Sequence, residues 1–173
     1  MIGFPVGMLY ANAGEWAIHK YLLHGAGKKR ESYWSFHFHE HHQASRKHDM
    51  IDPDYERPLV AAHAQGKEAA GLLFACVAHA PLFPVAPFFT TAVWFSAAMY
   101  YRRHKRAHMD PEWARRHLAW HYDHHMGPNQ DANWCVTWPW FDHVMGTREP
   151  YTGTEREAKD IERRARRQRR TAA

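Results

Sequence analysis

No Asp, Glu, Lys or Arg occurs between Ala69 and Tyr101, and this stretch limits the folds open to the chain more than any other feature. As one helix it would extend about 50 Å, well beyond the roughly 30 Å apolar core of a bilayer. Three prolines interrupt it near its middle, at Pro81, Pro84 and Pro87. Because proline breaks the interior of a helix, the stretch predicts a helical hairpin.

The arms of this hairpin are expected to run through Leu72–Val77 and Phe88–Tyr101. They are short for full membrane spans unless the first arm begins near Pro58, which would place Lys67 and Glu68 inside it. A mean hydropathy of −0.68 is also low for a protein with several spans. We expect the hairpin to enter a membrane, and the alternative is a hairpin buried in a soluble core.

A second apolar segment runs from Met1 to His24, with Glu15 and Lys20 as its only charged side chains. Lys28, Lys29 and Arg30 follow it, and the strongly basic segment Arg102–Arg116 follows the hairpin. Positive charge beside apolar segments favours the cytoplasmic side of a membrane. The sequence therefore predicts an all-α, membrane-associated domain over residues 1–153, with the hairpin on one side and a histidine-rich cytosolic cap on the other.

Residues 154–173 are expected to form a basic, charged C-terminal tail, either as a charged helix or as a frayed end. Six of its arginines fall within residues 163–170. Such a run is typical of a solvated end, and contact with anionic lipid head groups is the next interpretation. Nucleic acid is not an expected partner, because the histidine clusters would have no part in binding it.

Histidine accounts for 16 of the 173 residues, a surplus that needs a chemical explanation because buried imidazoles must be hydrogen-bonded or metal-bound. Ten of them form four clusters with the spacings HX4H, HX3HH, HX3H and HX2HH. These are His19 and His24; His37, His41 and His42; His104 and His108; and His121, His124 and His125.

Residues three or four apart lie on one face of an α-helix, so most of these imidazoles can converge within their cluster. His19 and His24 are the exception, because they lie about 140° apart on an ideal helix. We expect them to serve different ions unless Gly25 unwinds the helix end. Imidazole ligands suit iron, zinc, copper or nickel, and ten of them exceed the needs of one ion, so two metals are predicted.

The clusters and their flanking residues resemble the fatty acid hydroxylase / sterol desaturase superfamily. EWAIHKYLLHG, from Glu15 to Gly25, resembles the first histidine box of that superfamily. RRHLAWHYDHHMGPNQDANWCVTWPWFDHVMGT, from Arg115 to Thr147, resembles its last box. The closing aromatic–Asp–x–x–x–Gly–Thr pattern stands at Phe141, Asp142, Gly146 and Thr147.

The resemblance implies a membrane enzyme that hydroxylates a C–H bond of a fatty acyl or related lipid with O2 at a di-iron centre. The two iron ions, which zinc can replace on isolation, would be bound by His19, His24, His37, His41, His42, His104, His108, His121, His124 and His125. Electrons would come from a separate ferredoxin, cytochrome b5 or reductase. Alternatives are a sterol or carotenoid hydroxylase or desaturase of the same superfamily, or a non-catalytic histidine-rich metal-binding membrane protein.

In the second box, His39 competes with His37, because His39 also shares a helical face with His42. We favour His37. Among the other histidines, His48 and His63 are expected to be exposed and His79 to be a hydrogen-bonded interior residue.

His117 is expected to support or join the ligands, since it shares a helical face with His121. Carboxylates can orient metal-bound imidazoles by accepting their distal N–H groups. The sequence offers three candidates for this role, at Glu15, Glu40 and Asp123, and for the last two simple surface exposure is the equal alternative.

Overall fold

The computed structural model describes residues 2–60 and 62–171, and the regular elements in this part of the chain are all helical. The predicted all-α class is therefore confirmed. Met1, which the sequence placed in the first apolar segment, and the last two residues of the predicted tail lie outside the described residues.

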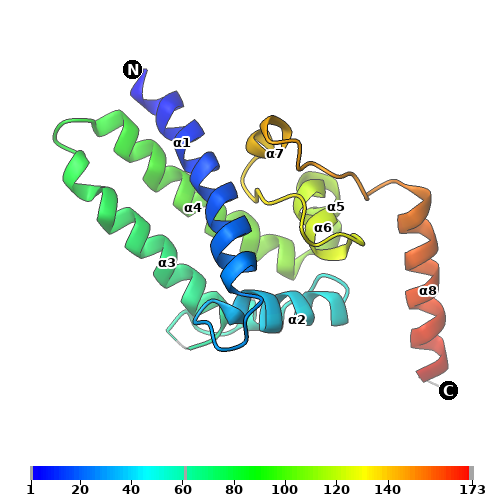
Figure 1. Cartoon of the computed structure of the whole chain (residues 1–173). Coiled ribbons are helices and arrows are strands. Elements are labelled where there is room, and N and C mark those ends of the chain that lie inside the picture. Colours follow the sequence, from blue (N-terminus) through cyan, green and yellow to red (C-terminus); the bar gives the residue numbers. More distant parts are fainter. Residues whose placement is uncertain (1, 61, 172–173) are drawn as a thin grey trace.

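The elements follow one another in a single series (Figure 1). They are α1 (Gly3–Ala17), the π-helix η1 (Ile18–Ala26), the π-helix η2 (His37–His41), α2 (His42–Lys47), the 3-10 helix η3 (Pro53–Glu56), α3 (Ala64–His79), the 3-10 helix η4 (Ala80–Leu82), α4 (Pro87–Met109), α5 (Pro111–His117), α6 (Ala119–Met126), α7 (Trp140–Val144) and α8 (Glu155–Thr171).

The predicted hairpin is present as α3 and α4, with its turn at the prolines. Each arm extends beyond the charge-free stretch at one end. Helix α3 begins at Ala64 and so includes Lys67 and Glu68, while α4 continues to Met109 and carries His104 and His108. The hairpin therefore links an apolar tip to the histidine region through continuous helices.

Helix α1 packs along α4, and Gly7 allows the two backbones to approach closely. A Cβ atom at Gly7 would lie 2.6 Å from the carbonyl oxygen of Phe89 and 2.8 Å from Cβ of Ala92. Close packing of this kind favours glycine because any side chain would force the helices apart. Helix α1 crosses α4, while α3 runs beside α4 as the other arm of the hairpin (Figure 1).

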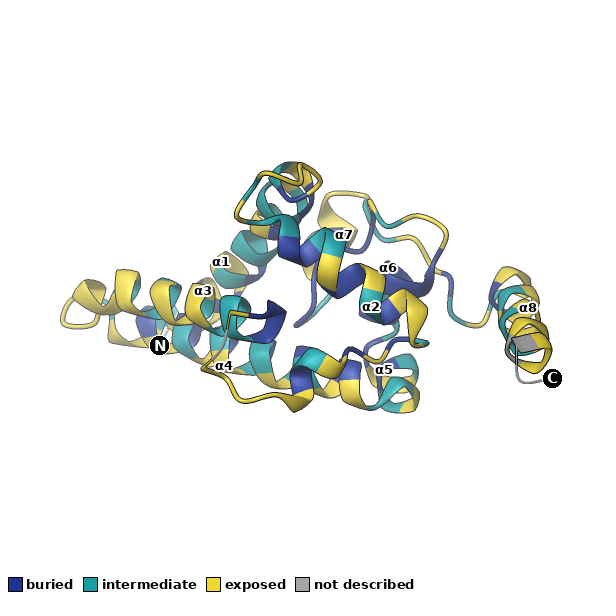
Figure 2. Ribbon diagram, turned by 90° about the horizontal axis from the view of Figure 1, so that it is seen from below, coloured by how far each residue is buried: buried dark blue, intermediate teal, exposed yellow. Residues whose placement is uncertain are grey.

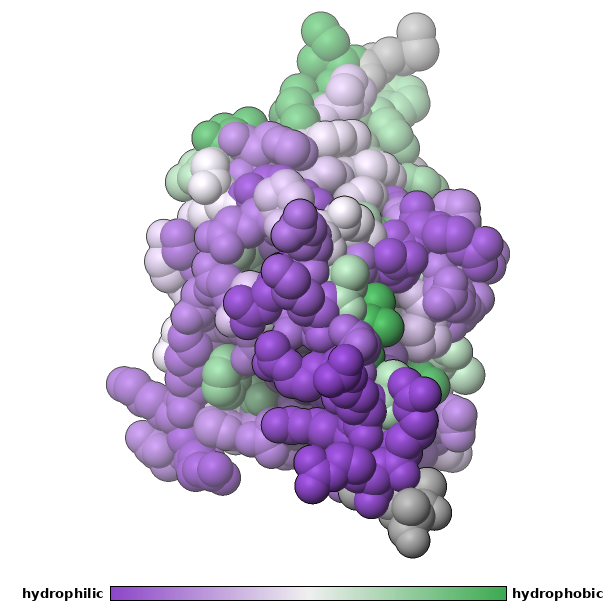
Figure 3. All heavy atoms as spheres, turned by 90° about the vertical axis from the view of Figure 1, so that its right-hand side faces the viewer, coloured by the Kyte–Doolittle hydropathy of each residue, from purple (hydrophilic) through white to green (hydrophobic). Residues whose placement is uncertain are grey.

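Burial is concentrated in the middle of the molecule, around α2 and α6, between the hairpin on one side and α8 on the other (Figure 2). At the end away from α8, large apolar side chains near the start of α1, on α3 and at the hairpin turn are exposed, among them Ile2, Phe74 and Val85. Figure 3 shows this apolar end above a predominantly hydrophilic face formed around α8. Among the described residues, none of the helices is both long and apolar enough to cross a membrane.

The predicted charged tail forms helix α8, which is fixed to the rest of the molecule by ion pairs. Arg115 contacts Glu157, whose side chain is buried, with an Nε–Oε1 distance of 2.7 Å. Arg164 contacts Asp49 over 3.1 Å. Contacts of this kind hold α8 beside α5 and the loop that follows α2.

Candidate metal centre

Nine of the ten predicted ligands form two buried groups, and within each group the candidate ligand atoms all lie within 4.8 Å of one another. We call them the first and second histidine groups. The groups are neighbours, because the rings of His42 and His125 stack with centroids 4.2 Å apart. The first group contains His19, His24, His37, His42 and His124; the second contains His41, His104, His108 and His125.

His19 and His24 lie in the same group, which corrects the expectation that they serve different ions. They belong to η1, a π-helix whose hydrogen bonds connect residues five apart. That winding places residues i and i+5 on one face, whereas an α-helix would separate them by about 140°. A local change of winding therefore brings the two rings of the HX4H cluster together.

The second box contains another short π-helix, η2, with a similar effect. His37 lies in the first group with His42, five residues later, while His41 lies in the second group. His39 belongs to neither group and contacts the backbone oxygen of Lys28 at 3.0 Å from its Nε2. His37 therefore shares a group with His42, and not with His41 as α-helical spacing predicts.

Helices α4 and α6 supply the remaining rings. His104 and His108 lie in one group, as their HX3H spacing predicts. His124 and His125 are adjacent in sequence and lie in different groups. His121 is outside both, yet it is buried and its Nε2 lies 3.0 Å from Nε2 of His108, so it borders the second group.

Backbone carbonyls fix several of the rings through their outer nitrogen, Nδ1. Nδ1 of His19 lies 2.5 Å from the carbonyl oxygen of Trp134, and Nδ1 of His124 lies 2.7 Å from that of Ala132. Nδ1 of His108 lies 2.9 Å from the carbonyl oxygen of Met50. A carbonyl only accepts, so each of these rings carries its proton on Nδ1 and presents the lone pair of Nε2 to its group.

Carboxylates have the same effect in the second group. Asp52 accepts from Nδ1 of His41 over 2.6 Å, and both side chains are buried. Glu68 contacts Nδ1 of His104 and also accepts from the hydroxyl of Tyr55 over 2.8 Å. Outer hydrogen bonds of this kind orient metal-binding histidines and increase their basicity.

These carboxylates were not among the three that the sequence suggested. Glu15 instead accepts from the backbone N–H of Thr137 over 2.8 Å, and Asp123 accepts from that of Thr152 over 2.7 Å. Glu40 is exposed, with Lys67 3.7 Å away. The expectation that Glu15 holds a ligand ring was therefore wrong. Asp123 is buried and holds no ligand ring among the described residues, while Glu40 has the surface position that the sequence left open.

The buried rings are kept neutral by their surroundings. Burial lowers the pKa of His124 to about 4. Burial, and then the nearby imidazoles, lower the pKa of His37, His42 and His125 well below the usual value. Neutral imidazole is the form that binds a metal ion, so no proton has to be displaced from these rings at neutral pH.

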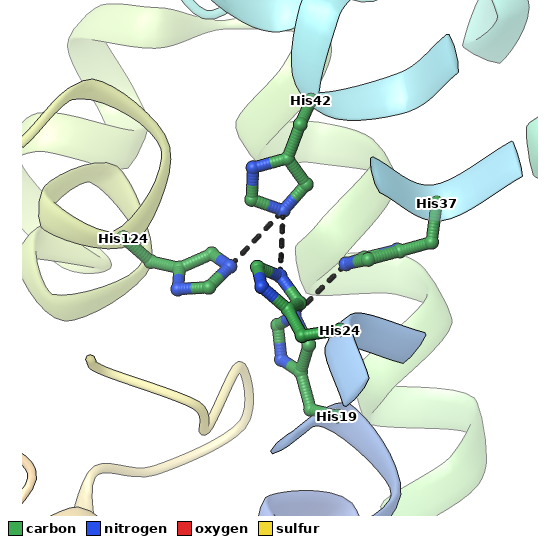
Figure 4. A group of neighbouring side chains, drawn as sticks. All are labelled: His19, His24, His37, His42 and His124. Atoms are coloured by element: carbon green, nitrogen blue, oxygen red, sulfur yellow. Dashed lines mark hydrogen bonds between the residues drawn. The ribbon is translucent and has the colours of Figure 1, made fainter. Parts of the chain in front are cut away.

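The inner nitrogens, which are the Nε2 atoms that face one another within a group, are better placed to bind a metal ion than to hydrogen-bond with one another (Figure 4). Nε2 of His19 lies 2.9 Å from Nε2 of His37, and Nε2 of His24 lies 3.1 Å from Nε2 of His42. In the second group, Nε2 of both His41 and His104 is buried without a hydrogen-bond partner among the described residues. Converging lone pairs without a proton donor are unfavourable unless a cation lies between them. The histidine groups could therefore each hold a metal ion.

The Phe141–Thr147 motif positions the loop that holds His19. Asp142 is buried and accepts from the backbone N–H groups of Trp134 and Cys135, over 2.8 and 2.9 Å. The hydroxyl of Thr147 donates to the same carboxylate over 2.7 Å, and Gly146 has a φ of +64°. The left-handed conformation favours glycine, so the motif supports the carbonyl that orients His19.

The remaining histidines are distributed only partly as expected. His48 and His143 are exposed, and His79 is half-buried and hydrogen-bonded to the hydroxyl of Tyr10 over 3.0 Å. His63 is buried with its Nε2 2.9 Å from the carbonyl oxygen of Pro58, so its predicted exposure was wrong. His117 is exposed at the end of α5, beside Trp113, and does not support the ligands.

An apolar groove of about 470 Å³ leads to the first histidine group. It is lined by residues of α1, α3 and α4, by η1, and by the segment from Trp34 to His37, so that His19 and His37 face it. Most of the lining is aliphatic or aromatic, with side chains such as Leu72, Ala75 and Val93. This cavity could not be located from the sequence, because its lining comes from several separate segments of the chain.

Comparison with known proteins adds no assignment: no protein family, curated protein or solved structure matches the chain. The functional argument therefore rests on the histidine groups, their outer hydrogen bonds and the groove.

Proposed function

We propose that the protein is an O2-dependent lipid oxygenase that hydroxylates a C–H bond of a fatty acyl or related chain at two histidine-bound iron ions. One observation carries this proposal: His19 and His37 of the first histidine group are among the residues that line the apolar groove. A groove with that lining suits a hydrocarbon chain, and a chain bound in it would have one carbon beside the metal centre.

The metals would be held by the two histidine groups, with His121 beside the second. When bound, a pair of irons would accept electrons from an external donor and supply the O2 activation that an unactivated C–H bond requires. The chain's own part is to keep the inner nitrogens deprotonated and correctly aimed. Trp134, Ala132 and Met50 do so through backbone carbonyls, and Asp52 and Glu68 through carboxylates.

The separations between inner nitrogens support iron over zinc. Two nitrogens about 2.05 Å from one ion lie roughly 2.9–3.1 Å apart when the angle between them is about 90–100°. The observed pairs, such as His19 with His37 at 2.9 Å and His24 with His42 at 3.1 Å, fall in this range. Angles near 90° suit higher coordination numbers, whereas structural zinc is usually tetrahedral, with wider angles.

Access from a membrane is supported by the exposed apolar end of the molecule. Phe74, Val77 and Leu73 project from α3, and Val85 projects from the hairpin turn, each more than half exposed. Apolar side chains gathered in this way mark a contact surface for a membrane or a partner. The groove lies between α1 and α3 on the same side, so a lipid could pass from a bilayer into it.

The direct test is to load the protein with ferrous iron and long-chain fatty acids or phospholipids, reduce it with dithionite without O2, remove the excess reductant and then add O2. Mass spectrometry is expected to detect a product with one added oxygen atom, and isotopically labelled O2 should supply that atom. Retention of two metals without any oxidised lipid would refute the proposal and favour a metal-binding protein without catalysis.

A pair of matched variants tests the groove itself. Ala75→Trp would fill the groove and is expected to abolish lipid oxidation while both metals remain bound. Ala70→Trp lies on the same helix, is exposed and does not line the groove, so its activity should be close to wild type. Equal activity in the two variants would contradict the assignment of the groove as the substrate site.

A further inference from the structure

A hollow of about 270 Å³ lies between α8 and the ends of α2 and α6, and arginine dominates its lining. We call it the arginine hollow. Its guanidinium groups come from Arg46 on α2 and from Arg156, Arg163, Arg164 and Arg167 on α8. One carboxylate, Asp160, is also in the lining.

The lining of the hollow has an excess of positive charge, with five arginines and one carboxylate. That carboxylate, Asp160, lies 3.0 Å from Arg156 and 3.5 Å from Arg163, while Arg164 pairs with Asp49, outside the lining, over 3.1 Å. Arginines concentrated in this way attract acidic surfaces, and the attraction weakens as salt increases.

Arg46 connects this surface to the second histidine group. Its Nη1 donates to the carbonyl oxygen of His125 over 2.7 Å and to that of Gly127 over 2.9 Å. His125 is itself a member of the second group. Arg46, which lines the arginine hollow, is thus hydrogen-bonded directly to a residue whose ring is a candidate metal ligand.

We propose that the arginine hollow is the docking site of an acidic electron-donor protein, an inference that rests on the proposed oxygenase function. One hydroxylation consumes the substrate, O2, two electrons and two protons, and releases the alcohol and one water molecule. A one-electron carrier must therefore bind and leave twice per turnover. Docking at the arginine hollow would bring such a carrier next to His125 without blocking the groove.

The position of the hollow favours a protein over a lipid surface. The exposed apolar end and the groove lie around the hairpin and the start of α1, whereas α8 lies at the other side of the molecule (Figures 1 and 2). A membrane that contacts the apolar end would leave α8 facing the aqueous phase. A soluble acidic carrier is therefore the occupant that fits both the charge and the location.

The test uses two doubly substituted proteins with the same change in charge. Arg163→Glu with Arg167→Glu reverses charge in the hollow, whereas Arg169→Glu with Arg170→Glu reverses charge on α8 outside its lining. Binding of an acidic two-iron ferredoxin and of a soluble cytochrome b5 domain is measured by calorimetry at low and high salt. We expect the hollow variant to lose about tenfold or more in affinity for one carrier, and the control much less.

Hydroxylation driven by dithionite separates this proposal from the proposed function. It should be equal in wild type and both variants, because no docking is needed. Equal carrier affinity in the two variants, or no binding of either carrier to the wild type, would overturn the docking site. So would a hollow variant that keeps carrier affinity but loses binding to phosphatidylserine vesicles. Failure of dithionite-driven hydroxylation in all three proteins would refute the oxygenase, while the binding measurements still decide the docking site.

Discussion

Asp52 is expected to control metal affinity at the second histidine group, although it cannot reach the ion itself. Its Oδ2 accepts from Nδ1 of His41 over 2.6 Å, and its Oδ1 accepts from the backbone N–H of Asp54 over 3.0 Å. Both oxygens are thus engaged at a side chain that is 2% exposed. Asp52→Asn keeps the shape of the residue and removes one acceptor.

The asparagine amide would then face one of two donors. If its NH2 group faces His41, the imidazole must move its proton to Nε2, and the lone pair that would bind the metal is lost. If it faces Asp54, the N-terminus of η3 loses its cap. Loss of an outer hydrogen bond typically weakens metal binding about 10–100-fold, or roughly 1.4–2.7 kcal/mol, and this is the decrease we expect.

Titration of the metal-free protein with Co2+ against a competing chelator measures this decrease. Two binding steps are expected, and only one should weaken in Asp52→Asn. Asp54→Asn is the matched control, because its carboxylate contacts Arg57 and the backbone N–H of Ala64 and no ligand ring. Unchanged affinities in Asp52→Asn, or an equal loss in Asp54→Asn, would refute the reasoning.

Three further predictions follow from local geometry. Gly7→Ala should destabilise the protein by about 1–3 kcal/mol through contact with α4, whereas Gly14→Ala, on the same helix with open space around it, should be neutral or stabilising in urea unfolding. Burial raises the pKa of Glu15 from 4.5 to about 7, so the contribution of Glu15 to stability falls as pH rises through this range. Glu15→Gln should remove that part of the pH dependence of stability, and identical stability–pH profiles of wild type and variant would contradict this. His37→Ala should reduce metal content while His39→Ala leaves it unchanged, and the reverse result in metal analysis would mean that the second box was assigned wrongly.

The hairpin and the order of the helices could be predicted from the sequence because they depend on local features. A charge-free stretch broken by three prolines specifies two arms and a turn. The ends of the arms could not be placed in the same way. Lys67 and Glu68 look like a boundary in sequence, yet they lie inside α3, where Glu68 contacts His104.

The histidines were identifiable from their spacing, but their partition into two groups was not. That partition depends on π-helical winding at η1 and η2, which makes residues five apart neighbours. An angle of 100° per residue gives the wrong neighbours there. The signal for unusual winding in the sequence was the HX4H spacing of His19 and His24, which an α-helix would place far apart.

Apart from Glu68 on α3, the residues that hold the rings lie in loops, where no periodicity guides a prediction. Asp52 lies in the segment that connects α2 to η3, and Trp134 and Ala132 contribute only their backbone oxygens. Backbone contributions are independent of side-chain identity, so no residue pattern reveals them. Asp142 is the exception, since its place in the closing motif marked it before its contacts to Trp134 and Cys135 were known.

The central claim is that two adjacent histidine groups each bind a metal ion, and metal counting in single-group variants tests it most directly. Protein purified without chelators should contain about two transition-metal ions per chain. His24→Ala in the first group and His104→Ala in the second should each retain about one, while the exposed His48→Ala retains two. One ion or none in the wild type, or an equal loss in His48→Ala, would contradict the account.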